Sequence, residues 1–307
     1  AALDDGGSDG GGRSGARGGS AASSSAEEGG SDDSEDSVDE EVRLELTELM
    51  NEVYLLGSMS HPNIMRFCAV CVDPPMIVSQ FYPHGSLFDL LWRARRAERR
   101  AVAELAWAKR LGMLRDVASG MVFLHSRRPA VIHGDLRSPN LLLDLAFGGE
   151  AAGARPRFHV KIADFGLARF LPGGGGGGGG AGGGANGDGG GESGGGGGNG
   201  ASSMKVSRVT NPRWSAPEVI RESSVSRAAD VFSFGVVMWE MLTWQQPFED
   251  MMSVQVLFQV THQKQRPELP DDDAALPGKP SLRTLPGYKD LMRACWEDRP
   301  EDRPPFD

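Results

Sequence analysis

Hydrophobic side chains recur at helical spacing in several segments of the chain. A period of three to four residues places such side chains on one face of a helix, where they can pack on a core. The pattern predicts a helix over 44–59, helical structure over 86–100 and a long helix over 104–125. From 231 to 242, directly after Asp230, nearly every side is apolar, which is typical of a helix buried in the middle of a helical region.

Two short apolar runs follow the first predicted helix. Residues 64–72 (IMRFCAVCV) and 75–82 (PMIVSQFY) are rich in β-branched and aromatic residues, and they predict two strands joined by a turn at 73–75. Cys68 and Cys71 have the spacing of half a zinc site, but no second pair completes it. We therefore expect both cysteines to be buried strand residues. The whole chain is thus predicted to contain a small, partly β region followed by a larger α region.

Two tracts contain almost no hydrophobic side chains. Residues 1–41 form an acidic tail rich in Gly and Ser, and residues from about 172 to 203 are nearly all Gly. Neither tract can bury enough surface to offset the entropy of ordering, so both are predicted to be disordered. One globular domain is then expected over 42–307. The tail has twelve acids and two arginines, which accounts for the formal net charge of −10; the near-neutral remainder argues against a nucleic-acid partner.

The sequence carries no membrane-spanning pattern. No apolar run approaches the roughly 18 residues that a membrane helix needs, and the N-terminus lacks the hydrophobic stretch of a signal peptide. The three cysteines cannot form a disulfide framework and fit a reducing compartment. We expect a cytoplasmic protein with no membrane segment in this chain, and a longer, membrane-anchored protein stays open as an alternative.

The strongest chemical pattern lies at 131–144 (VIHGDLRSPNLLLD). An Asp-Leu-x-x-x-Asn string at 135–140 is followed by DFG at 164–166, by APE at 216–218 and by Asp230 at the start of the buried helix. These spacings together resemble those of the protein kinase family. Within that family the chain is similar to the tyrosine-kinase-like group, which includes Raf-like and mixed-lineage kinases. The resemblance covers about residues 44–307, apart from insertions.

The resemblance implies an α+β, bilobal protein-kinase fold. Residues 42–82 would form a truncated small N-lobe, with the αC helix and the hinge-side strands, and residues 83–307 would form a mainly helical C-lobe. A member of this family transfers the γ-phosphate of ATP to Ser/Thr hydroxyls of protein substrates in intracellular signalling. It uses Mg²⁺ together with ATP.

The matched motifs assign a task to each catalytic residue. By resemblance, Asp135 accepts the proton of the substrate hydroxyl, and Asn140 and Asp164 supply the oxygen ligands that Mg²⁺ prefers. Arg137 stands where Ser/Thr kinases usually have a Lys that reaches the transferred phosphate. Arginine keeps the positive charge of lysine, but its planar guanidinium group replaces a compact ammonium group. We therefore expect reduced or altered activity rather than none.

The same resemblance places the adenine site at the end of the second predicted strand. Ser79 would be the gatekeeper, although an ordinary strand serine is the alternative. Gln80, Phe81 and Tyr82 would form the hinge whose backbone bonds the adenine, and Leu142 would lie under the ring.

Further matched residues have packing roles. His133 and Phe165 would stack in the hydrophobic spine, which Leu56 should join. Asp230 would accept hydrogen bonds from the backbone around His133. A buried ion pair between Glu218 and the Arg of the DRPPF segment, Arg303, would be expected to fix the substrate-binding segment.

The neighbourhood of the catalytic loop indicates the acceptor. Residues 135–140 (DLRSPN) lack the Arg-Asn arrangement of tyrosine kinases, and 210–218 (TNPRWSAPE) resembles tyrosine-kinase-like sequences, so Ser/Thr is favoured. However, Asn211 stands where Ser/Thr kinases usually have a Thr that touches the catalytic Asp, with Thr210 displaced by one.

Three further features depart from the family pattern. Glu52 matches the αC Glu, but no Lys precedes it in the sequence, and no GxGxxG motif precedes it in a strand context. Gly134 replaces the Arg that commonly follows the catalytic-loop His. Either the sequence upstream of Leu44 is truncated or mis-spliced, or the protein is a catalytically impaired pseudokinase or scaffold. The retention of Asp135, Asn140 and Asp164 favours the first.

Overall fold

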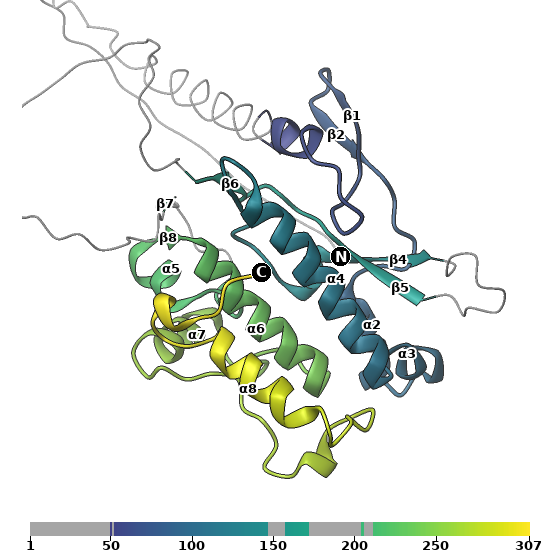
Figure 1. Ribbon diagram of the computed structural model, residues 1–307, viewed down its shortest axis with the longest axis vertical. Helices are drawn as coiled ribbons and strands as arrows, with labels where there is room; N and C mark the ends of the chain where they lie inside the picture. The colour runs from purple at the N-terminus through teal and green to yellow at the C-terminus, as the bar shows by residue number, and fades with distance from the viewer. Residues whose placement is uncertain (1–49, 51, 147–156, 172–203, 206–210) are drawn as a thin grey trace, which may run out of the picture. The chain divides into compact units, whose positions relative to one another are not determined.

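The computed structural model describes residues 50, 52–146, 157–171, 204–205 and 211–307 (Figure 1). The acidic tail over 1–41 and the Gly-rich insert over about 172–203 lie outside the described residues, so their predicted disorder stays a prediction. The described residues belong to one unit, Glu45–Asp307.

Most of the regular secondary structure in the described chain is helical. A helical stretch at 52–57 lies within the first predicted helix. The later α-helices are α2 (Leu87–Arg95), α3 (Arg99–Glu104), α4 (Trp107–Ser126), α5 (Pro217–Glu222), α6 (Arg227–Thr243), α7 (Ser253–Thr261) and α8 (Leu285–Cys295). Short 3₁₀ turns are η1 (Ser138–Asn140), η2 (Asp273–Ala275) and η3 (Pro300–Asp302). None of the described helices is both long and apolar enough to cross a membrane.

The strands are short and pair two by two, in antiparallel fashion. The pairs are β1 (Phe67–Cys71) with β2 (Met76–Ser79), β3 (Val131–Ile132) with β6 (Arg169–Phe170), β4 (Leu141–Ala146) with β5 (Arg157–Ile162), and β7 (Met204–Lys205) with β8 (Ser224–Val225). This mixture of helices and strand pairs is the predicted α+β class.

The predicted helical stretch over 86–100 is two helices. Ala97 adopts a left-handed conformation with φ 61°, and the N–H of Glu98 bonds back to the carbonyl of Arg93 at 3.2 Å. This geometry ends α2 and starts a new direction before α3. At its other end α2 begins with a capping box, in which Asp89 N–H donates to Ser86 Oγ and Ser86 N–H donates to Asp89 Oδ2.

Helix α6 lies at the centre of the helical region, next to α4 and α8 (Figure 1). Every residue from Ala229 to Thr243 is buried, as expected from a sequence that is apolar on nearly all sides. Helix α4 packs against β5, and Gly120 lies in this contact, where an added Cβ would be 2.6 Å from Cδ1 of Ile162. The core therefore joins the long helices to the strand pair that flanks the motifs.

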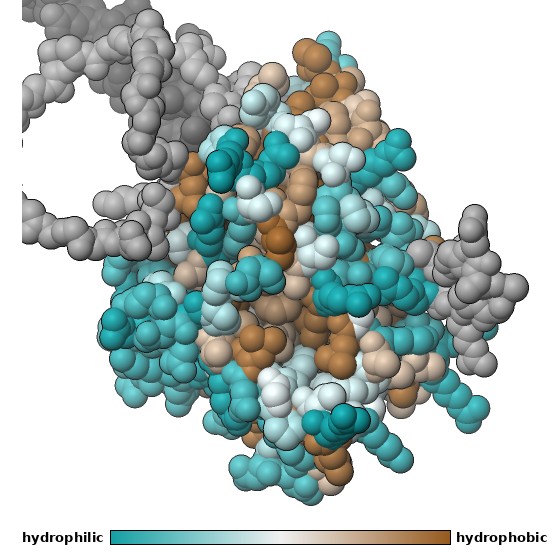
Figure 2. Space-filling model, viewed as in Figure 1, coloured by the Kyte–Doolittle hydropathy of each residue, from teal (hydrophilic) through white to brown (hydrophobic). Residues whose placement is uncertain are grey.

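The prediction that Cys68 and Cys71 are buried is wrong. Cys68 is exposed and Cys71 is half-buried, whereas Cys295 is buried. The strands β1 and β2 form a two-stranded ladder, and none of their residues is fully buried. Exposed apolar side chains on or beside this ladder include Val72 (83%) and Val78 (46%), and Figure 2 shows hydrophobic surface over this hairpin.

Candidate active site

The catalytic-loop motif lies between β3 and β4 and is held by the start of α6. Asp230 accepts hydrogen bonds from the backbone N–H groups of His133 (3.0 Å) and Gly134 (2.9 Å), as predicted. His125 also contacts Asp230 Oδ2 at 2.8 Å. Gly134 has φ 77°, a left-handed conformation that a residue with a Cβ rarely adopts. The loop is thus fixed through its backbone rather than through a side chain at 134.

Three side chains donate to the carboxylate of Asp135. Arg137 Nε and Asn140 Nδ2 each donate to Oδ2 at 2.9 Å, and Asn211 Nδ2 donates to Oδ1 at 2.9 Å. The Asp135 side chain is only 10% exposed. Charge-assisted bonds of this kind are short and strong, and they fix the orientation of a carboxylate. The predicted catalytic residues 135, 137 and 140 are therefore together in space.

The DFG segment is joined to the catalytic loop through the backbone. Ala163 N–H donates to the carbonyl of Asn140 at 2.9 Å, and the ring of Phe165 lies 5.1 Å from the ring of His133. Leu56, the third member of the predicted spine, is 1% exposed. Asp164 itself is exposed to solvent and has φ 66°. Phe165 is buried against His133 and holds this segment, while the carboxylate of Asp164 remains accessible.

Asn140 and Asp164 fit a magnesium ion. Nδ2 of Asn140 is directed at the carbonyl and carboxylate oxygens of Asp135, which leaves its Oδ1 as the atom that a cation can contact. Asp164 adds an exposed carboxylate next to it in the fold. Mg²⁺ takes few protein ligands, all of them oxygens, and completes its shell with water and substrate phosphates. Accordingly, the described residues contain no cluster of three or more His, Cys, Asp or Glu that would form an all-protein metal cage.

Glu52 reaches the DFG segment rather than a lysine. It accepts a hydrogen bond from the Phe165 N–H, and burial, followed by the nearby charge of Asp164, raises the pKa of Glu52. Within the described part of the chain no Lys or Arg forms an ion pair with it. Glu52 therefore supports the position of the DFG backbone. The lysine that usually pairs with this glutamate and contacts the ATP phosphates is not among the described residues.

The predicted hinge follows β2. Ser79 pairs with Phe67 across the β1–β2 ladder, and Gln80 N–H donates to the carbonyl of Arg66 at 2.9 Å. Phe81 is 83% exposed, whereas the Tyr82 ring is buried. The backbone around Phe81 is thus on the surface, where a ligand can reach it.

Leu142 is placed by the segment that follows the hinge. It forms a bridge with Ser86, and the N–H of Leu143 donates to the carbonyl of Gly85 at 2.9 Å. Leu142 is half-buried. The backbone after the hinge is therefore bonded directly to the strand that carries the predicted floor of the adenine site.

The predicted pair of Glu218 and Arg303 is present and bidentate. Arg303 Nη1 and Nη2 donate to the two carboxylate oxygens at 2.7 and 2.9 Å. The Arg303 side chain is 0% exposed and that of Glu218 14%, and Arg303 also donates to the carbonyls of Ala228 and Glu297. These bonds fix α5, and with it the APE segment, to α6 and the C-terminal part of the chain.

A buried carboxyl group of α6 was missed by the sequence reasoning. Glu240 accepts hydrogen bonds from Ser138 Oγ at 2.7 Å and from Trp214 Nε1 at 2.8 Å. It therefore connects the catalytic loop to the segment before APE. Burial raises the pKa of Glu240 to about 8. A single acid within the apolar run of 231–242 was the signal that could have identified it, because an acid is seldom buried without partners.

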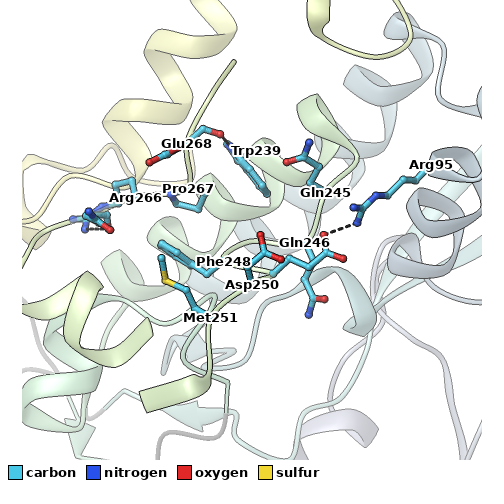
Figure 3. A pocket seen from close by; sticks show the side chains of 12 residues that line it. Arg95, Trp239, Gln245, Gln246, Phe248, Asp250, Met251, Arg266, Pro267 and Glu268 are labelled. Carbon is cyan, nitrogen blue, oxygen red and sulfur yellow. Dashed lines mark hydrogen bonds and ion pairs between the residues drawn. The ribbon is translucent and has the colours of Figure 1, made fainter. Parts of the chain in front are cut away.

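A cavity of about 470 Å³ lies away from these residues, between the end of α2 and the loops that flank α7 (Figure 3). Arg95 pairs with Glu249 at its edge. On the neighbouring segment, Arg213 donates to the carbonyls of Pro247 and Met251. None of the predicted site residues lines the cavity, so the candidate active site and this cavity are separate features.

Comparison with known proteins agrees with the motifs and the fold. The family model described as "Protein kinase domain" matches residues 33–307 of the chain. The chain is 32% identical over 266 residues to serine/threonine-protein kinase CTR1 of Arabidopsis thaliana and 32% identical over 264 residues to probable serine/threonine-protein kinase drkC of Dictyostelium discoideum, with 85% of this chain covered in each case. The chain spans 26% and 28% of the lengths of these two relatives. It belongs to the protein kinase family.

Proposed function

We propose that this chain transfers the γ-phosphate of ATP to Ser or Thr hydroxyls of protein substrates. The observation that carries the proposal is the carboxylate of Asp135, held by Arg137 and Asn140 and joined through the backbone of Asn140 to the DFG segment. Phosphoryl transfer depends mainly on positioning and on neutralising charge. A carboxylate fixed in orientation, with two oxygen ligands for Mg²⁺ in the adjoining segments, meets both needs.

In the proposed step, Asp135 receives the proton of the acceptor hydroxyl. The oxygen of that hydroxyl uses an electron pair to bond the γ-phosphorus of ATP, and the bond from this phosphorus to the β–γ bridging oxygen breaks, leaving its electron pair on ADP. Arg137 donates to Asp135 through Nε, so its terminal nitrogens remain for the transferred phosphate. Mg²⁺, when bound through Asn140 and Asp164, supplies neutralisation of the phosphate charge.

The adenine of ATP is proposed to bond the hinge backbone from Gln80 to Tyr82. Leu142 would pack under the ring, and Ser79 would border the inner end of the pocket. Glu52 would act indirectly, through its hydrogen bond with the DFG backbone. The names of the relatives, both serine/threonine kinases, support the choice of acceptor and favour an active enzyme over a pseudokinase or scaffold.

Protein substrates are the proposed partners, and we propose no nucleic-acid partner. We also propose that the protein acts in the cytoplasm, because none of its three cysteines is paired, as suits a reducing compartment.

The test is transfer of labelled phosphate from Mg-ATP to a generic Ser/Thr protein such as myelin basic protein. The unaltered chain should label it, and Asp135→Asn should reduce the rate by at least about 100-fold, since general base catalysis contributes on this scale. Asp290→Asn, an identical change at an exposed position of α8, should leave the rate unchanged. Equal rates for Asp135→Asn and the unaltered chain would refute Asp135 as the base, and ATP binding without transfer would indicate the scaffold.

A further inference from the structure

The turn between α2 and α3 carries a dense group of positive charges. Over residues 91–100 (LWRARRAERR) five arginines stand against one glutamate, which gives this stretch a formal charge of +4. Residues 42–307 as a whole are close to neutral, so the excess is local. We call this group the arginine cluster, and its members are Arg93, Arg95, Arg96, Arg99 and Arg100.

The break at Ala97 brings arginines of two helices to one turn. Ala97 has φ 61°, and α2 and α3 pack against each other on either side of it (Figure 1). Arg96 is the C-cap residue of α2, and Arg99 and Arg100 are the first two residues of α3. All three are exposed. Three like charges therefore lie within five residues, where they repel one another.

Counter-charges within the described residues serve only part of the cluster. Arg95 pairs with Glu249 at 2.5 Å, which ties the end of α2 to the loop between α6 and α7. The side chains of Arg96, Arg99 and Arg100 form no ion pair or hydrogen bond with any described residue. Their guanidinium groups are therefore available to an anionic ligand from outside.

Trp92 holds two guanidinium groups of the cluster in place. Its side chain is 46% exposed, and Cζ of Arg96 and of Arg95 lie 5.6 and 6.0 Å from the ring centroid. A cation–π contact of this kind restrains an arginine side chain through its flat face and leaves the N–H donors in the plane of the group free. Less side-chain freedom then has to be lost when a ligand binds.

The guanidinium group indicates the chemical class of that ligand. Its planar fork of N–H donors matches the oxygens of a phosphate or a carboxylate in bidentate fashion. A phosphoryl group on a Ser or Thr side chain has a charge of about −1.5 to −2 and three acceptor oxygens, whereas a carboxylate has one charge and two oxygens. Unpartnered arginines that lie this close together fit phosphoryl groups better. An anionic membrane would instead respond to positive charge without regard to the fork.

We propose that the arginine cluster is a docking site for a segment of a partner protein that carries phosphoserine or phosphothreonine. Arg96, Arg99 and Arg100 supply the bidentate donors, and Trp92 orients the guanidinium group of Arg96. Recognition of phosphorylated motifs by arginine clusters is an established mode of peptide binding. The inference goes beyond the proposed phosphoryl transfer and does not depend on it, since docking needs neither ATP nor an acceptor hydroxyl.

The experiment measures binding of the full chain to a fluorescent peptide with two phosphoserines, by anisotropy and without ATP. It is done at about 0.15 M salt, where interactions between exposed charges beyond about 8 Å are largely screened. The same peptide with two serines, or with two glutamates, gives the comparison. We expect the phosphorylated peptide to bind at least about 10-fold more tightly than either, because phosphate adds both charge and acceptor oxygens.

Two triple variants test the arginines directly. Arg96→Gln, Arg99→Gln and Arg100→Gln together should weaken binding of the phosphorylated peptide at least about 10-fold. Lysine at the same three positions keeps the charge and should still weaken binding about threefold or more, because an ammonium group lacks the planar fork. All three side chains are exposed, so the thermal unfolding midpoints of these variants should stay close to that of the unaltered chain.

The matched control removes the same number of charges elsewhere. It replaces three other exposed arginines by Gln, at Arg283, Arg293 and Arg299. Peptide binding by this variant should stay within about twofold of that by the unaltered chain. An equal loss in the control would assign binding to net charge and overturn the inference.

Other outcomes would also decide the question. Equal affinity for the phosphorylated peptide and the glutamate peptide would overturn the inference, as would unchanged binding in the Gln variant or in the Lys variant. Binding to phosphatidylserine–phosphatidylcholine vesicles, with no binding of the phosphorylated peptide, would assign the cluster to a membrane surface instead. A chain that binds the phosphorylated peptide and transfers no phosphate would support the docking site and refute the proposed function alone.

Discussion

At the scale of single residues, the charge state of Glu240 is coupled to the stability of the fold. Its side chain is buried and bonded to Ser138 and Trp214, and burial raises the pKa of Glu240 to about 8 from an ordinary 4.5. The folded protein therefore holds a proton there that the unfolded chain releases above its own, lower pKa. Stability linked to this proton is complete below about pH 4.5 and is lost as the pH rises through about 8.

Glu240→Gln should remove this dependence. The free energy of unfolding of the unaltered chain should fall between about pH 4.5 and pH 8 by up to roughly 1.4 kcal/mol per pH unit more than that of the variant, since one proton is involved. Guanidinium unfolding at several pH values measures both. Parallel pH curves would mean that Glu240 is ionised in the folded state and that its two donors suffice to hold the charge.

Arg303 is a second residue whose substitution should strongly lower stability, because its side chain is buried in an ion pair. Arg303→Met leaves the Glu218 carboxylate without its cation, and half-breaking a buried pair costs about 3–5 kcal/mol. The control is Arg299→Met, the same change at an exposed arginine paired with Glu301, which should not alter stability measurably. Urea unfolding of both variants tests the contrast. Equal losses would show that burial of the Arg303 pair has no special weight.

At the scale of elements, Gly112 and Gly120 of α4 have different surroundings where this helix packs against β5. Gly120→Ala should destabilise the fold by about 1–3 kcal/mol, since the new methyl group would meet the buried Ile162 side chain and the carbonyl of Asn63. Gly112→Ala meets only the end of the Arg157 side chain, at 3.4 Å, and should stabilise the helix by up to about 1 kcal/mol. Thermal unfolding would distinguish the two, and equal shifts would contradict the packing argument.

The elements also show what local sequence patterns can and cannot predict. The long helix over 104–125 corresponds to α4, Trp107–Ser126, because its apolar face repeats over five turns. The break at Ala97 was not predicted, since it depends on a left-handed residue that is neither Gly nor Asn. Burial of Cys68 was predicted wrongly, because strand-like composition gives no information about which surfaces of a hairpin have a neighbour.

At the scale of the whole described unit, the apolar surface near β1 and β2 should cause self-association. Val72 is 83% exposed and Val78 46%, and grouped exposed apolar side chains favour intermolecular contact. The double change Val72→Ser and Val78→Thr should reduce the concentration dependence of the sedimentation coefficient. Leu282→Ser, at a position that is 78% exposed and distant in sequence, should not. An unchanged profile in the double variant would place the contact elsewhere.

The site as a whole was predictable where motifs carry it. The clustering of Asp135, Arg137 and Asn140, the support from Asp230 and the pair of Glu218 with Arg303 all followed from motif spacing. The bridge through Glu240 to Ser138 and Trp214 was not predicted, because no motif marks the partners of a single buried acid. Those partners depend on tertiary packing, which a linear pattern does not encode.

The antiparallel register of β4 and β5 has a consequence for how such a protein can change during evolution. The register runs from Leu141 opposite Ile162 to Ala146 opposite Arg157, so Asn140 and Asp164 lie at one end of the hairpin and residues 147–156 connect the other end. Insertions or deletions there alter chain length without shifting Asn140 or Asp164. Related chains can therefore differ in length at that end of the hairpin while the two proposed metal ligands keep their places.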